Sequence, residues 1–148
     1  MSAPFGHALV AAAIARRMGV RSPLGLAAAA LAGNLPDFDI PISAVVHRDP
    51  WRFHRKEMHS LDFALAAGML AGAAGIVAAE SVEGERDLIA DAITGAVVVG
   101  SHIALDQVPY LPVRFGPKVL GLSVGGWIAD TLLWAAVAWA IWPRKSEG

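Results

Sequence analysis

Cysteine is absent from this chain of 148 residues, and charged residues are scarce at 17%. Without cysteine there can be no disulfide, cysteine-type zinc finger, iron–sulfur cluster or thiol nucleophile. A soluble domain usually carries about 25% charged residues, whereas hydrophobic residues here reach 55%. The formal net charge is only -1, so no overall positive field would attract DNA or RNA, and we expect no nucleic-acid partner. The length suits a single domain spanning residues 1–148.

Abundant alanine and short β-branched runs predict helices along almost the whole chain. Helices at 4–18 and 23–31 would form a short N-terminal hairpin, and neither is long enough to cross a hydrocarbon core of ~30 Å. Three long apolar runs follow at 61–79, 88–105 and 119–142, each near or above the length needed to span a bilayer. The sequence therefore predicts an all-α integral membrane helical bundle, with a soluble bundle of apolar helices as the alternative.

The charges between these runs predict an orientation. Residues 47–59 are basic, whereas residues 80–87 are acidic. The excess of Lys and Arg in cytoplasmic loops places the basic loop inside the cell, which predicts a multi-pass protein of the bacterial inner (cytoplasmic) membrane. Arg16, Arg17 and Arg21 at the turn of the first hairpin oppose this orientation, unless that hairpin does not cross the membrane.

A proline-containing segment at 35–41, Leu-Pro-Asp-Phe-Asp-Ile-Pro, separates the hairpin from the basic loop. Pro36 and Pro41 disfavour a helix here, so we expect an extended segment. Side chains at positions i and i+2 of an extended segment point the same way. Asp37 and Asp39 are therefore expected to face one side together.

Candidate metal ligands stand beside the predicted helix ends. In an up-down bundle with short loops, the starts of odd helices and the ends of even helices lie at one end. This rule predicts that seven side chains meet there: His7, Asp37, Asp39, His54, His59, His102 and Asp106. Burying such a group without partners would be costly, although each residue alone would more commonly be a hydrogen-bonded core histidine or a helix cap.

Imidazole and carboxylate ligands together suit zinc, with manganese, iron or magnesium as alternatives. His102 and Asp106 are four residues apart and share one helix face. His54 and His59 are five residues apart, about 140° around a helix, so at least one of them belongs to a loop. Seven ligands exceed the needs of one tetrahedral zinc ion, which suggests two ions with bridging carboxylates rather than one.

Four other polar residues have competing interpretations. His47 is expected to be a solvated loop residue, and Ser60 is expected to cap the helix that begins at residue 61. Arg55 could neutralise charge that develops on a substrate oxygen or could simply flank a membrane span. Asp130, well inside the last apolar run, is either a functional intramembrane acid or a residue that pairs with a neighbouring helix or stays protonated.

These motifs resemble the YdjM-like family of membrane-bound metal-dependent hydrolases. The resemblance runs from His7 to about residue 109 and rests on Leu-Pro-Asp-Phe-Asp at 35–39, His-Arg-Lys-Glu-Met-His-Ser at 54–60 and His-Ile-Ala-Leu-Asp at 102–106. It implies metal-binding roles for the seven residues above and a hydrolytic activity. More distantly, the His-x-x-x-Asp pair is similar to zinc-dependent phospholipase C, which implies phosphoester hydrolysis.

The chain departs from the family pattern at three positions. Lys56 stands where the family usually has Gly, Met58 where it usually has Thr, and Pro109 where it often has Thr. None of them removes a proposed ligand. They bear on the conformation of the loop and on any hydroxyl group behind the ligands.

The expected reaction is metal-assisted hydrolysis. One or two ions would lower the pKa of a bound water toward ~7 and polarise an ester oxygen, and Asp37 or Asp39 would take the water proton. A site at the bilayer edge favours a membrane lipid or a lipid-linked or small-molecule ester as substrate. The alternatives are a non-enzymatic metal-binding transporter or sensor, with Asp130 on the ion path, and a structural membrane module.

Overall fold

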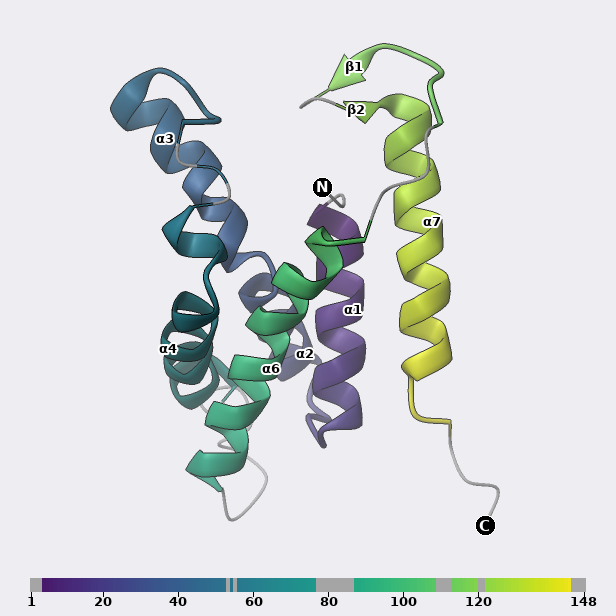
Figure 1. The fold of residues 1–148 in the computed structure, drawn as a ribbon. Helices are drawn as coiled ribbons and strands as arrows, with labels where there is room; N and C mark the ends of the chain where they lie inside the picture. The colour runs from purple at the N-terminus through teal and green to yellow at the C-terminus, as the bar shows by residue number, and fades with distance from the viewer. Residues whose placement is uncertain are drawn as a thin grey trace.

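The computed structural model describes residues 4–52, 54, 56–76, 87–108, 113–119 and 122–144. Within these residues the chain is helical apart from one short β-hairpin (Figure 1). The elements are α1 (Pro4–Arg17), α2 (Pro23–Ala32), the 3-10 turn η1 (Leu35–Phe38), α3 (Asp39–His47), the 3-10 turn η2 (Glu57–His59), α4 (Leu61–Ala71), the π-helical turn η3 (Gly72–Ile76), α6 (Leu88–Asp106), β1 (Lys118–Val119), β2 (Leu122–Ser123) and α7 (Val124–Ile141).

Side-chain caps mark where four helices begin. Ser22, Ser60 and Ser123 each accept a hydrogen bond from a backbone N–H in the first turn of α2, α4 and α7. Asp87 does the same for α6. These bonds satisfy N–H groups that have no partner inside the helix. The predicted cap at Ser60 is confirmed.

The N-terminal hairpin forms as predicted, with both helices within one residue of their expected ends. In Figure 1, α1 stands between α6 and α7. Ala11 and Ala15 are fully buried in the core that α1 shares with α2, α4 and α6, while Val10 and Ala13 are buried against Trp134 of α7. Small side chains on both faces let α1 pack closely on two sides at once.

Glycines set the spacing between α4 and α6. A Cβ added to Gly95 would come within 2.6 Å of the Cα of Gly72, and one added to Gly68 within 2.6 Å of the carbonyl oxygen of Gly95. The two backbones therefore touch directly. This contact lies in the second half of α4 and the first half of α6.

The expectation of an extended segment at 35–41 is wrong, because this segment forms η1 and the first turn of α3. Pro36 stands at the start of η1 and Pro41 in the first turn of α3. The N–H groups of a first turn make no intrahelical bond, so proline removes nothing there.

The last apolar run begins with strand rather than helix. β1 pairs antiparallel with β2, with Lys118 opposite Ser123, and Trp127 of α7 donates from Nε1 to the carbonyl oxygen of Val119 at 2.8 Å. The all-α expectation is therefore confirmed except for this hairpin, and α7 starts five residues later than the run, at Val124.

Two helices in the described part of the chain, α6 and α7, are long and apolar enough to cross a membrane. The third expected span begins as α4 and η3, but its last residues, 77–79, lie outside the described residues, so that span stays a prediction. Large apolar side chains are exposed on the outer faces of α4, α6 and α7, among them Leu70, Ile89, Leu132 and Trp139. Such surfaces suit contact with lipid.

Candidate metal centre

The start of α1 and the end of α6 lie side by side (Figure 1). The seven expected ligands gather there in three overlapping groups. Four parts of the chain deliver them: the first turn of α1, the junction of η1 with α3, the loop and η2 turn before α4, and the last turn of α6. In that order they supply His7; Asp37 and Asp39; His54 and His59; and His102 and Asp106.

His59 stands in the middle of the cluster and has a carboxylate at each ring nitrogen. Its Nε2 lies 3.7 Å from Asp37 Oδ1 and 3.6 Å from Asp106 Oδ2, and its Nδ1 lies 3.3 Å from Asp39 Oδ2. Asp37 and Asp39 thus both face His59, although they do so from helical turns and not from an extended segment. They reach different nitrogens of one imidazole from the helical junction.

His102 is fully buried and its ring orientation is set by the backbone. Nδ1 lies 2.8 Å from the carbonyl oxygen of Gly33, and a carbonyl can only accept, so Nδ1 carries the hydrogen and Nε2 carries the lone pair. Nε2 lies 3.4 Å from Asp37 Oδ1. His102 therefore presents its free lone pair to the centre of the cluster.

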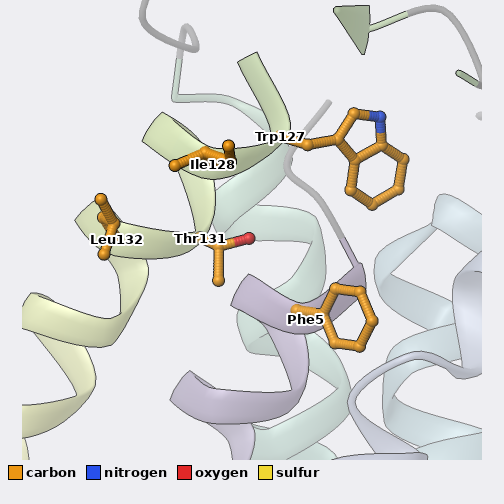
Figure 2. A pocket seen from close by; sticks show the side chains of 5 residues that line it. All are labelled: Phe5, Trp127, Ile128, Thr131 and Leu132. Atoms are coloured by element: carbon orange, nitrogen blue, oxygen red, sulfur yellow. The ribbon is translucent and has the colours of Figure 1, made fainter. Parts of the chain in front are cut away.

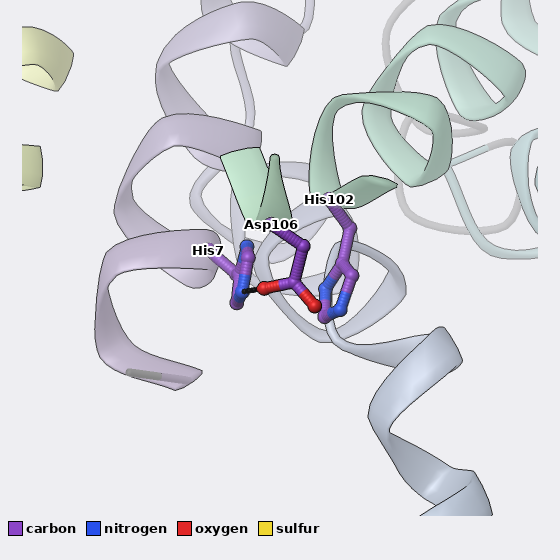
Figure 3. Close-up of side chains that lie close together, drawn as sticks. All are labelled: His7, His102 and Asp106. Atoms are coloured by element: carbon purple, nitrogen blue, oxygen red, sulfur yellow. Dashed lines mark ion pairs between the residues drawn. The ribbon is translucent and has the colours of Figure 1, made fainter. Parts of the chain in front are cut away.

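His7 stacks on His102 with ring centroids 3.7 Å apart (Figure 3). Its Nε2 lies 3.4 Å from Asp106 Oδ1, the ion pair drawn in the figure. The predicted i, i+4 pair of His102 and Asp106 thus shares one face of α6, with the carboxylate between the two imidazoles in the view of Figure 3.

The cluster leaves buried nitrogen atoms unsatisfied. Both ring nitrogens of His7 and of His59, and Nε2 of His102, are buried and make no hydrogen bond within the described residues. A buried polar atom without a partner costs about 1–3 kcal/mol. A divalent ion would take up such lone pairs, and imidazole with carboxylate is a donor set that zinc, manganese or iron accepts. The residues therefore fit a metal ion.

The charges in the cluster move two pKa values in opposite directions. Burial alone would raise the pKa of Asp37, but the neighbouring imidazoles of His102, His59 and His7 outweigh burial and hold this pKa well below its usual range. Burial alone would lower the pKa of His59, but Asp106, Asp37 and Asp39 raise it to about 9. A metal ion binding at neutral pH must therefore displace a proton from His59.

A small cavity opens on the cluster. It has a volume of about 100 Å³ and is lined by His59, Ile103, Asp106 and Gln107. A cavity of this size is large enough to hold water. Water or a small polar group can therefore approach His59 and Asp106 directly.

The YdjM inner membrane protein family matches residues 1–146 of the chain. The chain belongs to that family. No curated protein and no solved structure matches it. Membership confirms the resemblance to YdjM proteins and agrees with the two apolar helices α6 and α7, while the hydrolase part of the resemblance stays a prediction.

A second cavity of this YdjM protein is apolar. It has a volume of about 310 Å³ and lies between the starts of α1 and α7, where Figure 2 shows its lining of Phe5, Trp127, Ile128, Thr131 and Leu132. Phe5 precedes His7 by two residues, about 200° around the helix. The apolar cavity and the metal centre therefore occupy the same end of α1 on different faces.

Two of the other predicted residues, His47 and Asp130, lie apart from the cluster. Arg55 lies outside the described residues, so its role stays a prediction. His47 ends α3 and is half-buried rather than a solvated loop residue. Asp130 is buried and accepts a hydrogen bond from Trp134 Nε1 at 3.1 Å, so it pairs within α7.

Sequence reasoning missed Gly33, whose carbonyl orients His102, and Ile103 and Gln107, which line the cavity. Gln107 directly follows Asp106 and could have been suspected from that position. A backbone carbonyl leaves no mark in a side-chain motif, so Gly33 could not have been found this way.

Proposed function

We propose that this YdjM-family protein is a membrane-bound hydrolase that uses a divalent metal ion, zinc in the first instance, to cleave a phosphoester or another ester. One observation carries the proposal: four histidines and three aspartates from four separate parts of the chain converge in a buried cluster, where six of the eight imidazole nitrogens make no hydrogen bond within the described residues. A histidine cluster that only supported the fold would satisfy these atoms. The cavity beside His59 and Asp106 supplies access.

A bound ion would lower the pKa of a coordinated water toward ~7 and polarise the ester oxygen. Asp37 is the carboxylate best placed to take the water proton. Its contacts with His59 and His102 all involve Oδ1, which leaves Oδ2 available. The Asp37 side chain is 16% exposed, against 1% for Asp39. Water can therefore reach Asp37 more readily than Asp39.

The substrate we propose is a membrane lipid or a lipid-linked ester, with a small-molecule ester as the alternative. The cluster lies at the end of the apolar helix α6, where a lipid headgroup would sit at the bilayer edge. The apolar cavity between α1 and α7 is of a size and lining that suit hydrocarbon. A headgroup ester could reach His59 and Asp106 while the chain stays in apolar surroundings.

We further propose a single multi-pass domain with the cluster at the cytoplasmic face. Arg48, Arg52 and Lys56 are exposed in the segment that also carries His54 and His59. Basic loops are retained on the cytoplasmic side. Substrate would then reach the site from the inner leaflet.

The test begins with the full chain purified in detergent, its metal content measured by elemental mass spectrometry. Wild type should carry one or two equivalents of zinc, manganese or iron, and His102→Ala/Asp106→Ala should carry none. The matched control is His47→Gln, a histidine outside the cluster, which should keep the metal. Metal-loaded wild type should then hydrolyse a phospholipid in mixed micelles.

Two results would overturn the proposal in different ways. Substoichiometric metal in wild type after reconstitution would indicate a structural module. Stoichiometric metal without turnover of phosphoesters or carboxylic esters would indicate a non-enzymatic metal-binding membrane protein.

A further inference from the structure

The possible ligands form three groups that share histidines. Their donor atoms lie within 4.8 Å of one another in His7, His102 and Asp106; in Asp37, His59 and His102; and in Asp39, His54 and His59. We call the second of these the inner group. Because a neutral imidazole has one lone pair, a histidine that belongs to two groups can serve only one ion.

His102 and His59 each belong to two groups. His102 offers only Nε2, because its Nδ1 donates to the Gly33 carbonyl oxygen. His59 turns Nε2 toward Asp37 and Nδ1 toward Asp39, so its lone pair can point to one side only. When an ion is bound in the inner group, each neighbouring group therefore lacks one histidine. Neither of them can then bind a second ion with all of its ligands.

Asp39 has the contacts of a supporting residue. Its Oδ1 lies 3.1 Å from His54 Nδ1, and its Oδ2 lies 3.3 Å from His59 Nδ1. Both carboxylate oxygens thus face ring nitrogens, in a side chain that is 1% exposed. A carboxylate behind a histidine holds the hydrogen on the near nitrogen and directs the lone pair of the far nitrogen to the metal. Here that directs His59 Nε2 into the inner group.

Asp106 is held in a similar way from the other side. His7 Nε2 faces its Oδ1 at 3.4 Å, while its Oδ2 faces His59 Nε2 at 3.6 Å. Asp106 also lines the small cavity with His59. It therefore stands at the open side of the inner group.

We propose that the cluster binds one metal ion, on Asp37, His59 and His102, and that Asp39, His54 and His7 are positioning residues behind it. The proposal rests on the metal binding proposed above and replaces two ions with one. Two histidines and one carboxylate are a ligand set that leaves a coordination position open for water, as catalytic zinc sites require. Asp106 and the cavity lie on that open side.

The test measures zinc stoichiometry and affinity in the full chain after equilibrium dialysis in detergent. Wild type should bind one equivalent, and Asp37→Asn or His102→Ala should bind none under the same conditions. Asp39→Asn should still bind one equivalent with a dissociation constant raised about 10–100-fold, the usual effect of losing a residue behind a ligand. Asp39→Glu should recover part of this loss, and the exposed control Asp62→Asn should match wild type.

A spectroscopic readout separates positioning from general stability. In the zinc-loaded protein, ¹⁵N shifts of histidine should place the hydrogen of His59 on Nδ1 and the metal on Nε2. Asp39→Asn should alter the ¹⁵N shifts of His59 and the cobalt(II) absorption bands without changing the amount of metal bound. Unchanged shifts and bands in a folded Asp39→Asn protein would overturn the positioning role. If Asp39→Asn does not fold, Asp39→Glu and His54→Ala provide the same measurement.

The stoichiometry also separates this proposal from the one on which it rests. Two equivalents in wild type, falling to one in Asp39→Asn or His54→Ala, would overturn the single ion and leave metal binding intact. His54 Nε2, buried and without a hydrogen bond in the described residues, would then complete the second site. No zinc in wild type would overturn the proposed function itself.

Discussion

The candidate metal centre and the interface of α1 with α7 both bury polar side chains, but they do so differently. At the interface, Asp130 is buried and accepts a hydrogen bond from Trp134, one turn along the same helix. In the metal centre, nitrogens of His7, His59 and His102 are equally buried and have no hydrogen bond within the described residues. A satisfied buried group is accounted for by the fold, whereas an unsatisfied cluster needs a further explanation, such as the capacity to bind an ion.

Packing also differs between the α4–α6 contact and the α1–α7 interface. Helices α4 and α6 approach backbone to backbone at Gly68 and Gly95. On the other side of α1, Gly6 faces the side chain of Trp134, and an added Cβ would come within 2.6 Å of that ring. A side chain can move aside more readily than a backbone, so the α4–α6 spacing is the more rigid of the two.

The largest expected effect comes from removing the shared ligand. His59→Ala should lower hydrolysis at least about 10³-fold, because both the metal and the open site depend on this imidazole. Membrane insertion and folding should be retained, as measured by detergent extraction and circular dichroism. His47→Ala is the control. If His59→Ala were as active as wild type, the cluster would not differ functionally from the α1–α7 interface.

The next effect tests the packing. Gly95→Val should destabilise the protein by about 1–3 kcal/mol, the usual cost of overpacking, because its side chain would meet the backbone at Gly68 and Gly72. Gly6→Ala should cost less, since Trp134 can shift. Thermal unfolding in detergent measures both. A larger loss in Gly6→Ala would contradict the greater rigidity of the α4–α6 contact.

Raising the pH should change the Tm of the metal-free protein only. The folded-state pKa of His59 is raised from 6.5 to about 9, so its stabilising contribution is fully present below pH ~6.5 and is lost as the pH rises through about 9. The Tm of metal-free wild type should therefore fall over this range, while metal-free His59→Gln should show a weaker dependence. A Tm of metal-free wild type that rises over the same range would contradict the assignment.

The smallest effect is expected at Asp130. Asp130→Asn should keep the metal and the activity and should cost at most about 1 kcal/mol, because the asparagine oxygen can still accept the Trp134 hydrogen bond. Metal content, turnover and thermal unfolding can be measured on one preparation. Loss of metal flux in proteoliposomes made with this variant would instead favour the transporter alternative.

Local signals predicted much of the fold. Proline at the start of α1 and α2 and Ser60 before α4 marked helix starts within one residue. The same reasoning failed at Pro36 and Pro41, because proline excludes a helix only where its missing N–H would have been bonded. It also missed the strands at 118–119 and 122–123, whose pairing is a contact between residues rather than a pattern within a run.

The sequence alone specifies an apolar helical chain with imidazoles and carboxylates beside its helix ends. Composition and helix caps are local properties, and the up-down order of the helices is a topological one. Which nitrogen of each histidine faces inward, and which oxygen of Asp39 or Asp106 it meets, depends on how closely the helices approach. That approach is set by contacts between distant residues, such as Gly68 with Gly95 and Gly33 with His102. The arrangement of the seven candidate ligands in three groups that share histidines is therefore visible only in the folded chain.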